Sequence, residues 1–376
     1  MKKLIDICDI QYGYAFDSKC FTDDSCYPPL VRIRDVKRGY SETYYSGDYP
    51  KEYVLASGDL LVGMDGEFNI ARWKCDGALL NQRVCKLIAK KGTNEEYLRF
   101  AMTKALKEIE RRTAFVTVKH LSAKELNKLQ LSVPDLSKQN RVAEILSRLE
   151  KVIDFRRQEL QKLDNLIKAR FVEMFGDPVD NPMGWNKKRL QDIVSDDCSI
   201  SYGIVQTGDD KEEGVPVFRP VDIVNRVPKL DELKKTTEEI SNKYKRTILK
   251  GREMLITVRA NIADTCIVGE EFKGCNVGRG IVPIRTKEDI MVLEFLKYLM
   301  DSKHLNDDIK RKAKGITLIQ LNMEDLREVE LIIPPVEQQK IFVDFAKKID
   351  KSKVEVQKAL DETQKLFDSL MQQYFG

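Results

Sequence analysis

Apolar residues recur with a 4-3 spacing in two stretches of the chain, at 142–174 and 342–370. This spacing predicts a heptad seam, in which one face of a long helix packs against a partner helix. The apolar seam positions are Val142, Leu146, Leu149, Ile153, Leu160, Leu163 and Ile167 in the first stretch, and Phe342, Ile349, Val356, Leu360, Phe367 and Leu370 in the second. Prolines precede both stretches and a glycine ends each, which predicts two helices of about 38 residues, or ~57 Å each.

Polar residues interrupt both seams, at Arg156 and Arg170 in the first and at Lys353 in the second. Such interruptions argue against a simple homodimer that could be extended without limit. The pattern leaves two arrangements open. Either the two helices pair along their seams, or each helix packs separately on the part of the chain that precedes it.

The two seams belong to an internal repeat with an offset of 200 residues. Residues 117–176 align without gaps on 317–376, and eleven of these sixty positions are identical. The identities keep to the apolar spacing and to the ends of the helices, as in Leu121/Leu321, Pro134/Pro334, Gln139/Gln339 and Phe175/Phe375. Upstream the match is weaker, although 29–32 still matches 216–219. The chain therefore consists of two copies of one unit.

Each copy begins with a module that lacks the heptad pattern, and we call residues 1–133 the first module and 177–333 the second module. Alternating or β-branched runs at 60–62, 83–88 and 253–258 are separated by glycine, proline and aspartate, which predicts short strands. Helical patterns follow late in each module, at 94–112 and 287–312. We expect mixed α/β modules with largely antiparallel sheets, each followed by a long helix, at 134–176 and 334–376.

Composition adds little to this picture. No apolar run approaches the ~20 residues of a membrane span, and the first residues lack a secretory signal, so we expect a soluble, cytoplasmic protein without membrane contact. The 64 basic and 60 acidic residues give a net charge of +4, which permits phosphate binding on one face without requiring it. The eight cysteines are scattered singly, which predicts reduced structural thiols and no paired zinc ligands.

The sequence lacks the motifs of the enzymes that act on DNA. Its two histidines, His120 and His304, stand at non-equivalent places in the repeat, which argues against a histidine metal site or a catalytic triad. It has no G-x-x-x-x-G-K-[ST] loop to hold ATP, and no Asn-Pro-Pro-aromatic stretch of the kind that adenine methyltransferases use. We therefore expect no catalytic residue, metal or cofactor in this chain.

Predicted loops of both modules carry arginine, amide and aromatic side chains. Arginine suits guanine edges, amides suit adenine edges, and lysine suits phosphates. The DNA-binding candidates are Tyr12, Tyr14, Arg32, Arg34, Arg38, Arg72, Lys74, Gln82, Arg83 and Lys119 in the first copy, and Tyr202, Arg219, Arg226, Arg259, Asn261, Arg279, Lys314 and Thr317 in the second. Each alone better fits a solvated or salt-bridged side chain, whereas the loops at 117–121 and 314–318 fit plain strand-entering turns as well as they fit a phosphate contact. Only the recurrence in both copies favours DNA binding.

The order of module, proline-containing entry and long helix, given twice, resembles the DNA specificity subunits of Type I restriction-modification systems. The resemblance covers the whole chain. Its most specific strings are Pro-Pro-Val-Glu-Gln-Gln at 334–339, similar to the family's Pro-Pro-Leu-x-x-Gln, and the Gly-Trp start of a recognition domain at 184–193. Gly-Asp-Leu-Leu at 58–61 resembles the family's Gly-Asp-Ile-Leu strand. The first helix entry, Pro-Asp-Leu at 134–136, departs from the pattern, as does Arg-Glu-Met-Leu at 252–255.

The resemblance implies two tandem α/β target recognition domains whose long helices pack as an antiparallel coiled coil. It implies a non-catalytic subunit whose domains each read one half of an asymmetric bipartite site in double-stranded DNA. The implied partners are two methyltransferase subunits, which bind S-adenosylmethionine, and two restriction/translocase subunits, which use ATP and Mg²⁺. The rival hypothesis is a coiled-coil interaction scaffold that binds no DNA.

Overall fold

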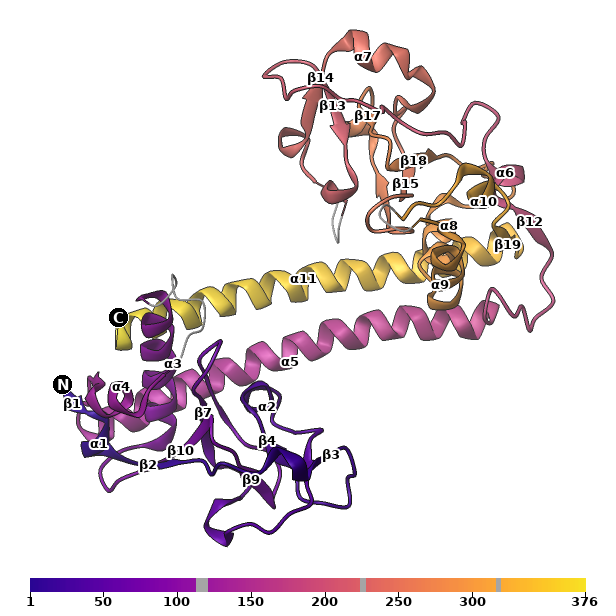
Figure 1. Ribbon diagram of the computed structural model, residues 1–376. Coiled ribbons are helices and arrows are strands. Elements are labelled where there is room, and N and C mark those ends of the chain that lie inside the picture. Colours follow the sequence, from indigo (N-terminus) through magenta and orange to yellow (C-terminus); the bar gives the residue numbers. More distant parts are fainter. Residues whose placement is uncertain (113–120, 224–227, 316–318) are drawn as a thin grey trace. The chain divides into compact units, whose positions relative to one another are not determined.

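The computed structural model describes the chain except for residues 113–120, 224–227 and 316–318 (Figure 1). The described residues form two compact units. The first unit comprises Met1–Gln158 and Gln357–Gly376, and the second comprises Glu159–Val356. Each unit therefore combines one α/β module with a segment of each long helix.

The two long helices are α5 (Leu136–Phe175) and α11 (Val336–Phe375), of 40 residues each. Within the first unit, Arg156 of α5 donates hydrogen bonds to the Ala359 carbonyl and the Thr363 hydroxyl of α11. Within the second unit, Lys353 of α11 pairs with Asp164 of α5 at 2.6 Å. Later residues of α5 thus meet earlier residues of α11, so the helices pack antiparallel, as the resemblance implied.

The residues predicted for the seam are all buried or half-buried in the two units. The buried ones are Val142, Leu146, Ile153, Ile167 and Phe342, and the half-buried ones are Leu149, Leu160, Leu163, Ile349, Val356, Leu360, Phe367 and Leu370. The polar interruptions are accommodated by specific partners. Arg156 and Lys353 bond across to the other helix, and the Arg170 guanidinium lies 5.9 Å from the centre of the Phe345 ring.

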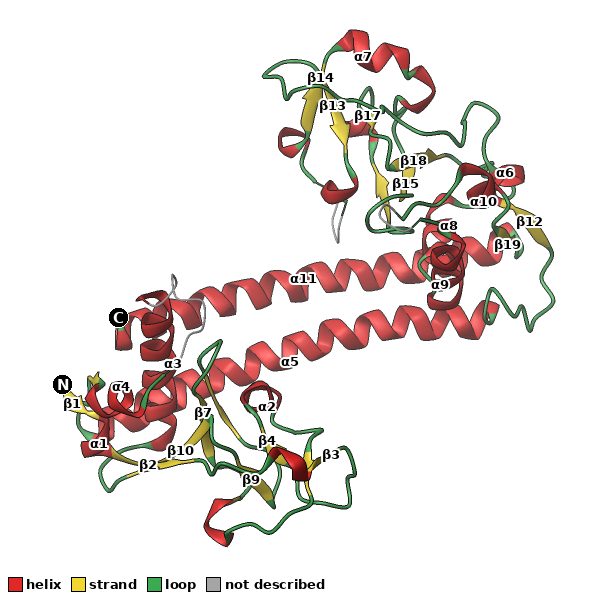
Figure 2. Cartoon of the chain, viewed as in Figure 1, coloured by secondary structure: helices red, strands yellow, loops and turns green. Residues whose placement is uncertain are grey.

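The module of the first unit is built around two small sheets (Figure 2). An antiparallel sheet has the order β2 (Cys8–Tyr12), β10 (Val84–Ala89), β7 (Leu60–Gly63) and β8 (Asn69–Arg72). A second sheet has the order β4 (Leu30–Val31), β9 (Ala78–Leu80) and β6 (Val54–Leu55), and β4 and β9 run parallel. Two-stranded pairs join β3 (Phe21–Thr22) to β5 (Tyr44–Tyr45) and β1 (Lys2–Lys3) to β11 (Gln130–Leu131). The helices are α1 (Leu4–Ile7), α2 (Ile33–Arg38), α3 (Glu95–Arg112) and α4 (Ala123–Lys128).

The module of the second unit repeats this plan. One sheet has the order β16 (Thr265–Val268), β15 (Glu253–Thr257) and β18 (Ile281–Ile284), and another has the order β14 (Lys234–Thr236), β13 (Val215–Phe218) and β17 (Asn276–Val277). Strands β13 and β17 run parallel. A further pair joins β12 (Lys187–Arg189) to β19 (Glu330–Ile332). The helices are α6 (Leu190–Ile193), α7 (Glu238–Lys243), α8 (Leu293–Met300), α9 (Lys303–Lys312) and α10 (Met323–Arg327).

The strands predicted at 60–62, 83–88 and 253–258 are confirmed as β7, β10 and β15, and the helix predicted at 94–112 as α3. The single helical pattern predicted at 287–312 is wrong in its extent. Helix α8 begins only at Leu293, and Asp301 and Ser302 separate it from α9. The pattern of apolar residues alone does not show where the backbone leaves the helix.

A buried glutamine ties the start of α5 to its module. Gln139 is 1% exposed. Its side-chain oxygen accepts a hydrogen bond from the Asn94 N–H at 2.9 Å, where α3 begins. Its side-chain nitrogen donates to the carbonyls of Pro134, at 2.8 Å, and Gly92, at 3.2 Å. One side chain thus satisfies three backbone groups in the segments that lead into the two helices.

The second copy repeats this arrangement at the start of α11. Gln339 is fully buried, and its oxygen accepts from the Val292 N–H at 2.9 Å, just before α8. Its nitrogen donates to the carbonyls of Pro334, at 2.8 Å, and Ile290, at 3.0 Å. The glutamine that is identical in the two helix entries is therefore a structural clamp between module and helix.

Burial predicts which cysteines react with alkylating reagents. Burial raises the pKa of the thiols of Cys8, Cys85 and Cys266 to about 12, so only about one in ten thousand is ionised at pH 8. Cys26 and Cys75 are exposed. We expect iodoacetamide to label these two in the folded chain and the three buried thiols only after unfolding, as peptide mass spectrometry would show. Equal labelling rates for Cys85 and Cys26 would contradict this packing.

No helix among the described residues is long and apolar enough to cross a membrane.

Candidate nucleic-acid interface

In the first module, the backbone of residues 80–83, at the end of the parallel strand pair, forms a hydrogen-bonded platform. Strands β4 and β9 place Val31 opposite Leu80. The Tyr14 N–H donates to the Leu80 carbonyl at 3.0 Å, and the Met64 N–H donates to the Arg83 carbonyl at 2.9 Å. The backbone on both sides of residues 81 and 82 is therefore held by neighbouring segments.

The second module forms the same platform with other residues. Strands β13 and β17 place Phe218 opposite Val277. The Ile204 N–H donates to the Val277 carbonyl at 2.8 Å, and the Val258 N–H donates to the Gly280 carbonyl at 2.8 Å. Both bonds have counterparts in the first module, so Leu80 corresponds to Val277 and Arg83 to Gly280.

This correspondence aligns candidate DNA-contacting residues of the two modules. Arg32 follows β4 and Arg219 follows β13, at matching places. Likewise Gln82 stands two residues beyond Leu80, and Arg279 stands two residues beyond Val277. The sequence match between 29–32 and 216–219 had indicated the first of these pairs, whereas only the structure reveals the second.

The platform of the first module borders a hollow of about 440 Å³. Four predicted DNA-contacting residues line it, and they come from two segments about fifty positions apart in the sequence. These residues are Arg32, Arg34, Gln82 and Arg83. The structure therefore brings together basic and amide side chains that the sequence could only suggest one by one.

The platform of the second module also gathers candidate residues. Gly280 lies against Pro220 and Arg259, since a Cβ placed on it would come within 2.5 Å of the Pro220 ring and 3.4 Å of the Arg259 Cβ. Arg219 precedes Pro220, and Arg279 precedes Gly280. Three predicted arginines thus surround one strand end.

Several of these arginines already have partners. Arg219 forms a two-pronged ion pair with Asp222, at 2.8 and 3.0 Å, and Arg83 pairs with Asp65 at 2.7 Å. Arg259 donates to the side chain of Gln320. Such bonds hold a guanidinium in one orientation while leaving some of its five N–H groups open to a ligand.

Other predicted DNA-binding residues of the first module contact neighbouring groups of the same module. The Tyr12 hydroxyl donates to Asn127 at 3.3 Å, and Arg38 lies 3.9 Å from Glu42. Lys74 donates to the Arg38 carbonyl at 3.5 Å. The ring of Tyr14 is 41% exposed and packs on other aromatic rings.

In the second module, Tyr202 packs against the core, Asn261 is exposed, and Lys314 lies 3.7 Å from Asp325. Three further candidates, Lys119, Arg226 and Thr317, lie outside the described residues.

Three groups of its own module hold the guanidinium of Arg72. Its guanidinium pairs with Glu95 at 2.8 Å and with Glu96, and donates to the Gly58 carbonyl at 2.6 Å. We expect Arg72→Ala to lower the free energy of unfolding by about 1 to 2 kcal/mol and to leave the recognised DNA sequence unchanged. Denaturant unfolding and motif mapping would check both. A motif that relaxes at one base would instead assign Arg72 a reading role.

The sequence analysis missed the acidic and amide side chains that bind some of these arginines and leave others without a partner. Asp35 and Asp222 lie three residues after Arg32 and Arg219, and each accepts a hydrogen bond from the backbone N–H of that arginine, at 2.9 and 2.7 Å. The Arg-x-x-Asp spacing, repeated in both modules, is a signal that the sequence did contain. The long-range partners of Arg83 and Arg259 had no such signal.

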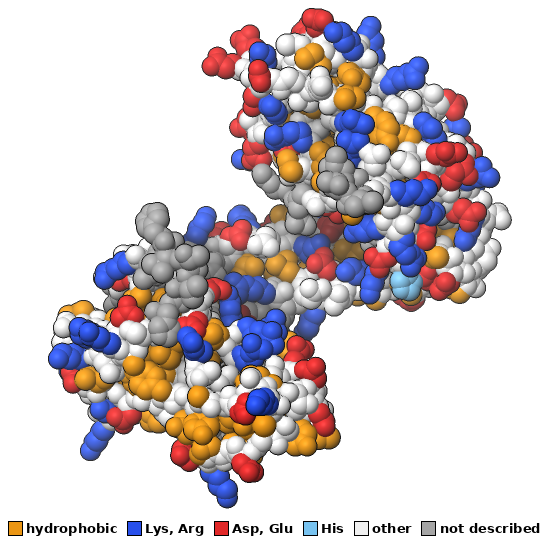
Figure 3. Space-filling model, in the orientation of Figure 1, with side chains coloured by type: hydrophobic (Ala, Val, Ile, Leu, Met, Phe, Trp, Pro, Cys, Tyr) orange, Lys and Arg blue, Asp and Glu red, His pale blue; other side chains and the backbone are white. Residues whose placement is uncertain are grey.

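Charged side chains of both signs are interspersed over the visible surface of each unit (Figure 3). This agrees with the near balance of 64 basic and 60 acidic residues. Among the described residues, the visible face therefore shows no broad positive field, and the net charge of +4 is small for a chain of this length.

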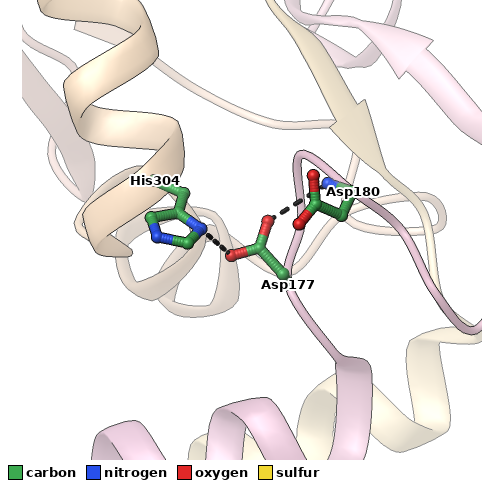
Figure 4. A group of neighbouring side chains, drawn as sticks. All are labelled: Asp177, Asp180 and His304. Carbon is green, nitrogen blue, oxygen red and sulfur yellow. Dashed lines mark hydrogen bonds and ion pairs between the residues drawn. The ribbon is translucent and has the colours of Figure 1, made fainter.

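One cluster in the second unit has the residue types of a metal site, namely Asp177, Asp180 and His304 (Figure 4). His304 lies 2.5 Å from the Asp177 carboxylate. Partial burial alone would raise the pKa of Asp177, but hydrogen bonds from the N–H groups of Asp180 and Val179, together with His304, lower it. These contacts account for the cluster as a turn after α5.

Known proteins share this architecture. The family model of the Type I restriction modification DNA specificity domain matches residues 1–165 and 182–364. The Type I restriction enzyme EcoBI specificity subunit of Escherichia coli is 30% identical, over 98% of this chain and 84% of that protein. The Type I restriction enzyme MjaVIII specificity subunit of Methanocaldococcus jannaschii is 21% identical, over 88% of this chain and 86% of that protein.

Solved structures share the fold at lower identity. The S subunit of a Type I restriction-modification system from M. genitalium has a TM-score of 0.62 at 13% identity, over 100% of this chain and 95% of that one. A chain from a type I R-M system, solved in work on complex assembly and conformational transition, has a TM-score of 0.56 at 19% identity, over 100% and 96%. Because the family model matches both copies of the repeat, the chain belongs to the family of DNA specificity subunits of Type I restriction-modification systems, which are non-catalytic.

Proposed function

We propose that each module reads one half of an asymmetric bipartite site in double-stranded DNA, and that the paired helices set the distance between the halves. The observation that carries this proposal is the pair of matching platforms. The two backbone bonds that flank the platform in one module have counterparts in the other, whereas the side chains differ, with Gln82 and Arg83 in one and Arg279 and Gly280 in the other. A shared frame with different reading groups suits two different half-sites.

The dimensions of the helices support the second part of the proposal. Two modules that read the same side of a duplex would contact half-sites centred about one helical turn apart, ~34 to 36 Å. Helices of 40 residues are about 60 Å long. Their length suffices to separate two modules by that distance.

In this proposal the chain supplies sequence recognition, and partner subunits carry out the methylation and the cleavage of DNA. We propose that it docks two methyltransferase subunits and works with two restriction/translocase subunits. The methyltransferase subunits would bind S-adenosylmethionine and flip the target adenine, and the others would use ATP and Mg²⁺. The residues of this chain would bind and position the DNA.

The test is to coexpress the chain with its methyltransferase subunit and to map methylated adenines across the host genome by single-molecule sequencing. We expect two short defined sequences of different composition, separated by a fixed number of unspecified bases. The assembled complex should also lose about a thousandfold or more in DNA affinity between 50 and 200 mM salt, because it contacts several phosphates. A short undivided motif, or the absence of both a motif and salt-dependent binding, would favour the interaction scaffold instead.

A further inference from the structure

We propose that one structural position in each module contacts a base edge in the major groove of DNA. This position is occupied by Gln82 in the first module and by Arg279 in the second. From their chemistry, Gln82 reads an adenine in the first half-site, and Arg279 reads a guanine in the second. The inference rests on the proposed function and adds to it the residues that distinguish one base from another.

The position is fixed by backbone bonds on both sides. Before it, Tyr14 and Asn81 form a parallel bridge in the first module, as do Ile204 and Gly278 in the second. The Arg279 N–H itself donates to the Ile204 carbonyl at 2.8 Å, and the Gln82 N–H donates to the Asn81 side chain at 2.8 Å. A reading side chain on such a frame approaches DNA with its Cα already placed, which specific hydrogen bonding requires.

Among the described residues, this is the one matching pair of candidate positions at which both side chains lack a partner, since Arg32 is also free but its counterpart Arg219 is held by Asp222. Gln82 and Arg279 are exposed, and neither side chain forms a hydrogen bond or an ion pair with a described residue. By contrast, Arg83, Arg219 and Arg259 are held by Asp65, Asp222 and Gln320. A side chain that must exchange water for a base edge binds that base more favourably if no other group of the chain competes for its hydrogen bonds.

The chemistry of the two side chains assigns the bases. A glutamine amide can both accept from adenine N6 and donate to adenine N7, so it pairs with adenine in a two-pronged way. An arginine guanidinium donates twice, to O6 and N7 of guanine. Because the position carries a glutamine in one module and an arginine in the other, the two half-sites must differ at the base it contacts.

The experiment uses the complex with the methyltransferase subunit and four variants. Gln82→Ala and Arg279→Ala remove the reading groups. Gln130→Ala and Arg246→Ala are the matched controls, because each removes an exposed side chain of the same type from the same module. Methylated motifs are mapped for all four, and affinities are measured for duplexes that each carry one changed base pair. Thermal unfolding verifies that every variant is folded.

We expect Gln82→Ala to relax a single adenine of the first half-site and Arg279→Ala to relax a single guanine of the second, with the other half unchanged each time. Discrimination at that base pair should fall about tenfold or more. The controls should keep the full motif.

The inference is overturned if both variants keep the motif, if the relaxed base is of another kind, or if affinity falls equally for every duplex, as it would for a phosphate contact. A wild-type complex without a bipartite motif would instead refute the proposed function.

Discussion

Gln339→Ala is expected to lower the free energy of unfolding of the chain by about 3 kcal/mol. The substitution removes a fully buried side chain together with its three hydrogen bonds, to Val292, Ile290 and Pro334. It leaves one N–H and two carbonyl groups in an apolar interior, and each unpaired buried group costs about 1 to 3 kcal/mol, offset where water enters. Denaturant unfolding of the purified chain measures the loss.

The neighbouring glutamine is the matched control. Gln338 lies in the same first turn of α11, is half-buried, and forms no side-chain hydrogen bond with a described residue. Gln338→Ala should change the free energy of unfolding by no more than about 0.5 kcal/mol. Similar losses for the two variants would show that the clamp contributes little, and that the glutamine shared by both helix entries needs another explanation. Gln139→Ala should repeat the large loss in the first unit.

Gly203→Ala is expected to destabilise the second module by about 3 kcal/mol and to abolish recognition of the second half-site. A Cβ at this position would lie 2.0 Å from the Val277 carbonyl oxygen, which belongs to the backbone of the parallel strand pair. To avoid this clash, the backbone at residue 203 and the strand that precedes Arg279 must move apart. Gly13→Ala should do the same in the first module, where the Cβ would lie 2.1 Å from the Asn81 carbonyl oxygen.

Gly274→Ala separates this steric effect from the general cost of adding a methyl group. A Cβ there meets nothing within 4 Å, and only its positive φ of 89° penalises alanine, by about 1 kcal/mol. Unfolding measurements and the methylated motif should therefore set Gly203→Ala far apart from Gly274→Ala. A Gly203→Ala chain of wild-type stability that still directs methylation to both half-sites would contradict the platform described above.

The long helices were predictable because their signal is long and redundant. The 4-3 spacing persists over several heptads, the prolines mark the starts, and the repeat supplies the pattern twice. Helix α8 shows the limit of such reasoning. Its apolar pattern merges with that of α9, and its start at Leu293 follows the Val292 N–H that is bound by Gln339, some 47 residues away in the sequence. A hydrogen bond between such distant residues produces no signal in the local sequence pattern.

The recognition surface was predictable in its residue types but not in its arrangement. Strands β4 and β17 contain two residues each, too few for an alternating pattern, and the parallel pairing joins segments about fifty residues apart in the first module and about sixty in the second. The sequence therefore provided no basis for ranking these basic and amide residues as candidates for DNA contacts. Distant partners such as Asp65 and Gln320 decide which of them are held and which are free.

The central claim is that the two modules read separate half-sites, and a module exchange tests it most directly. Residues 1–133 are replaced by the corresponding module of another specificity subunit, the hybrid is coexpressed with the methyltransferase subunit, and methylated adenines are mapped. We predict that one half of the motif changes to that of the donor, while the other half and the spacer stay as they were. A motif that changes in both halves, or in neither, would contradict the account.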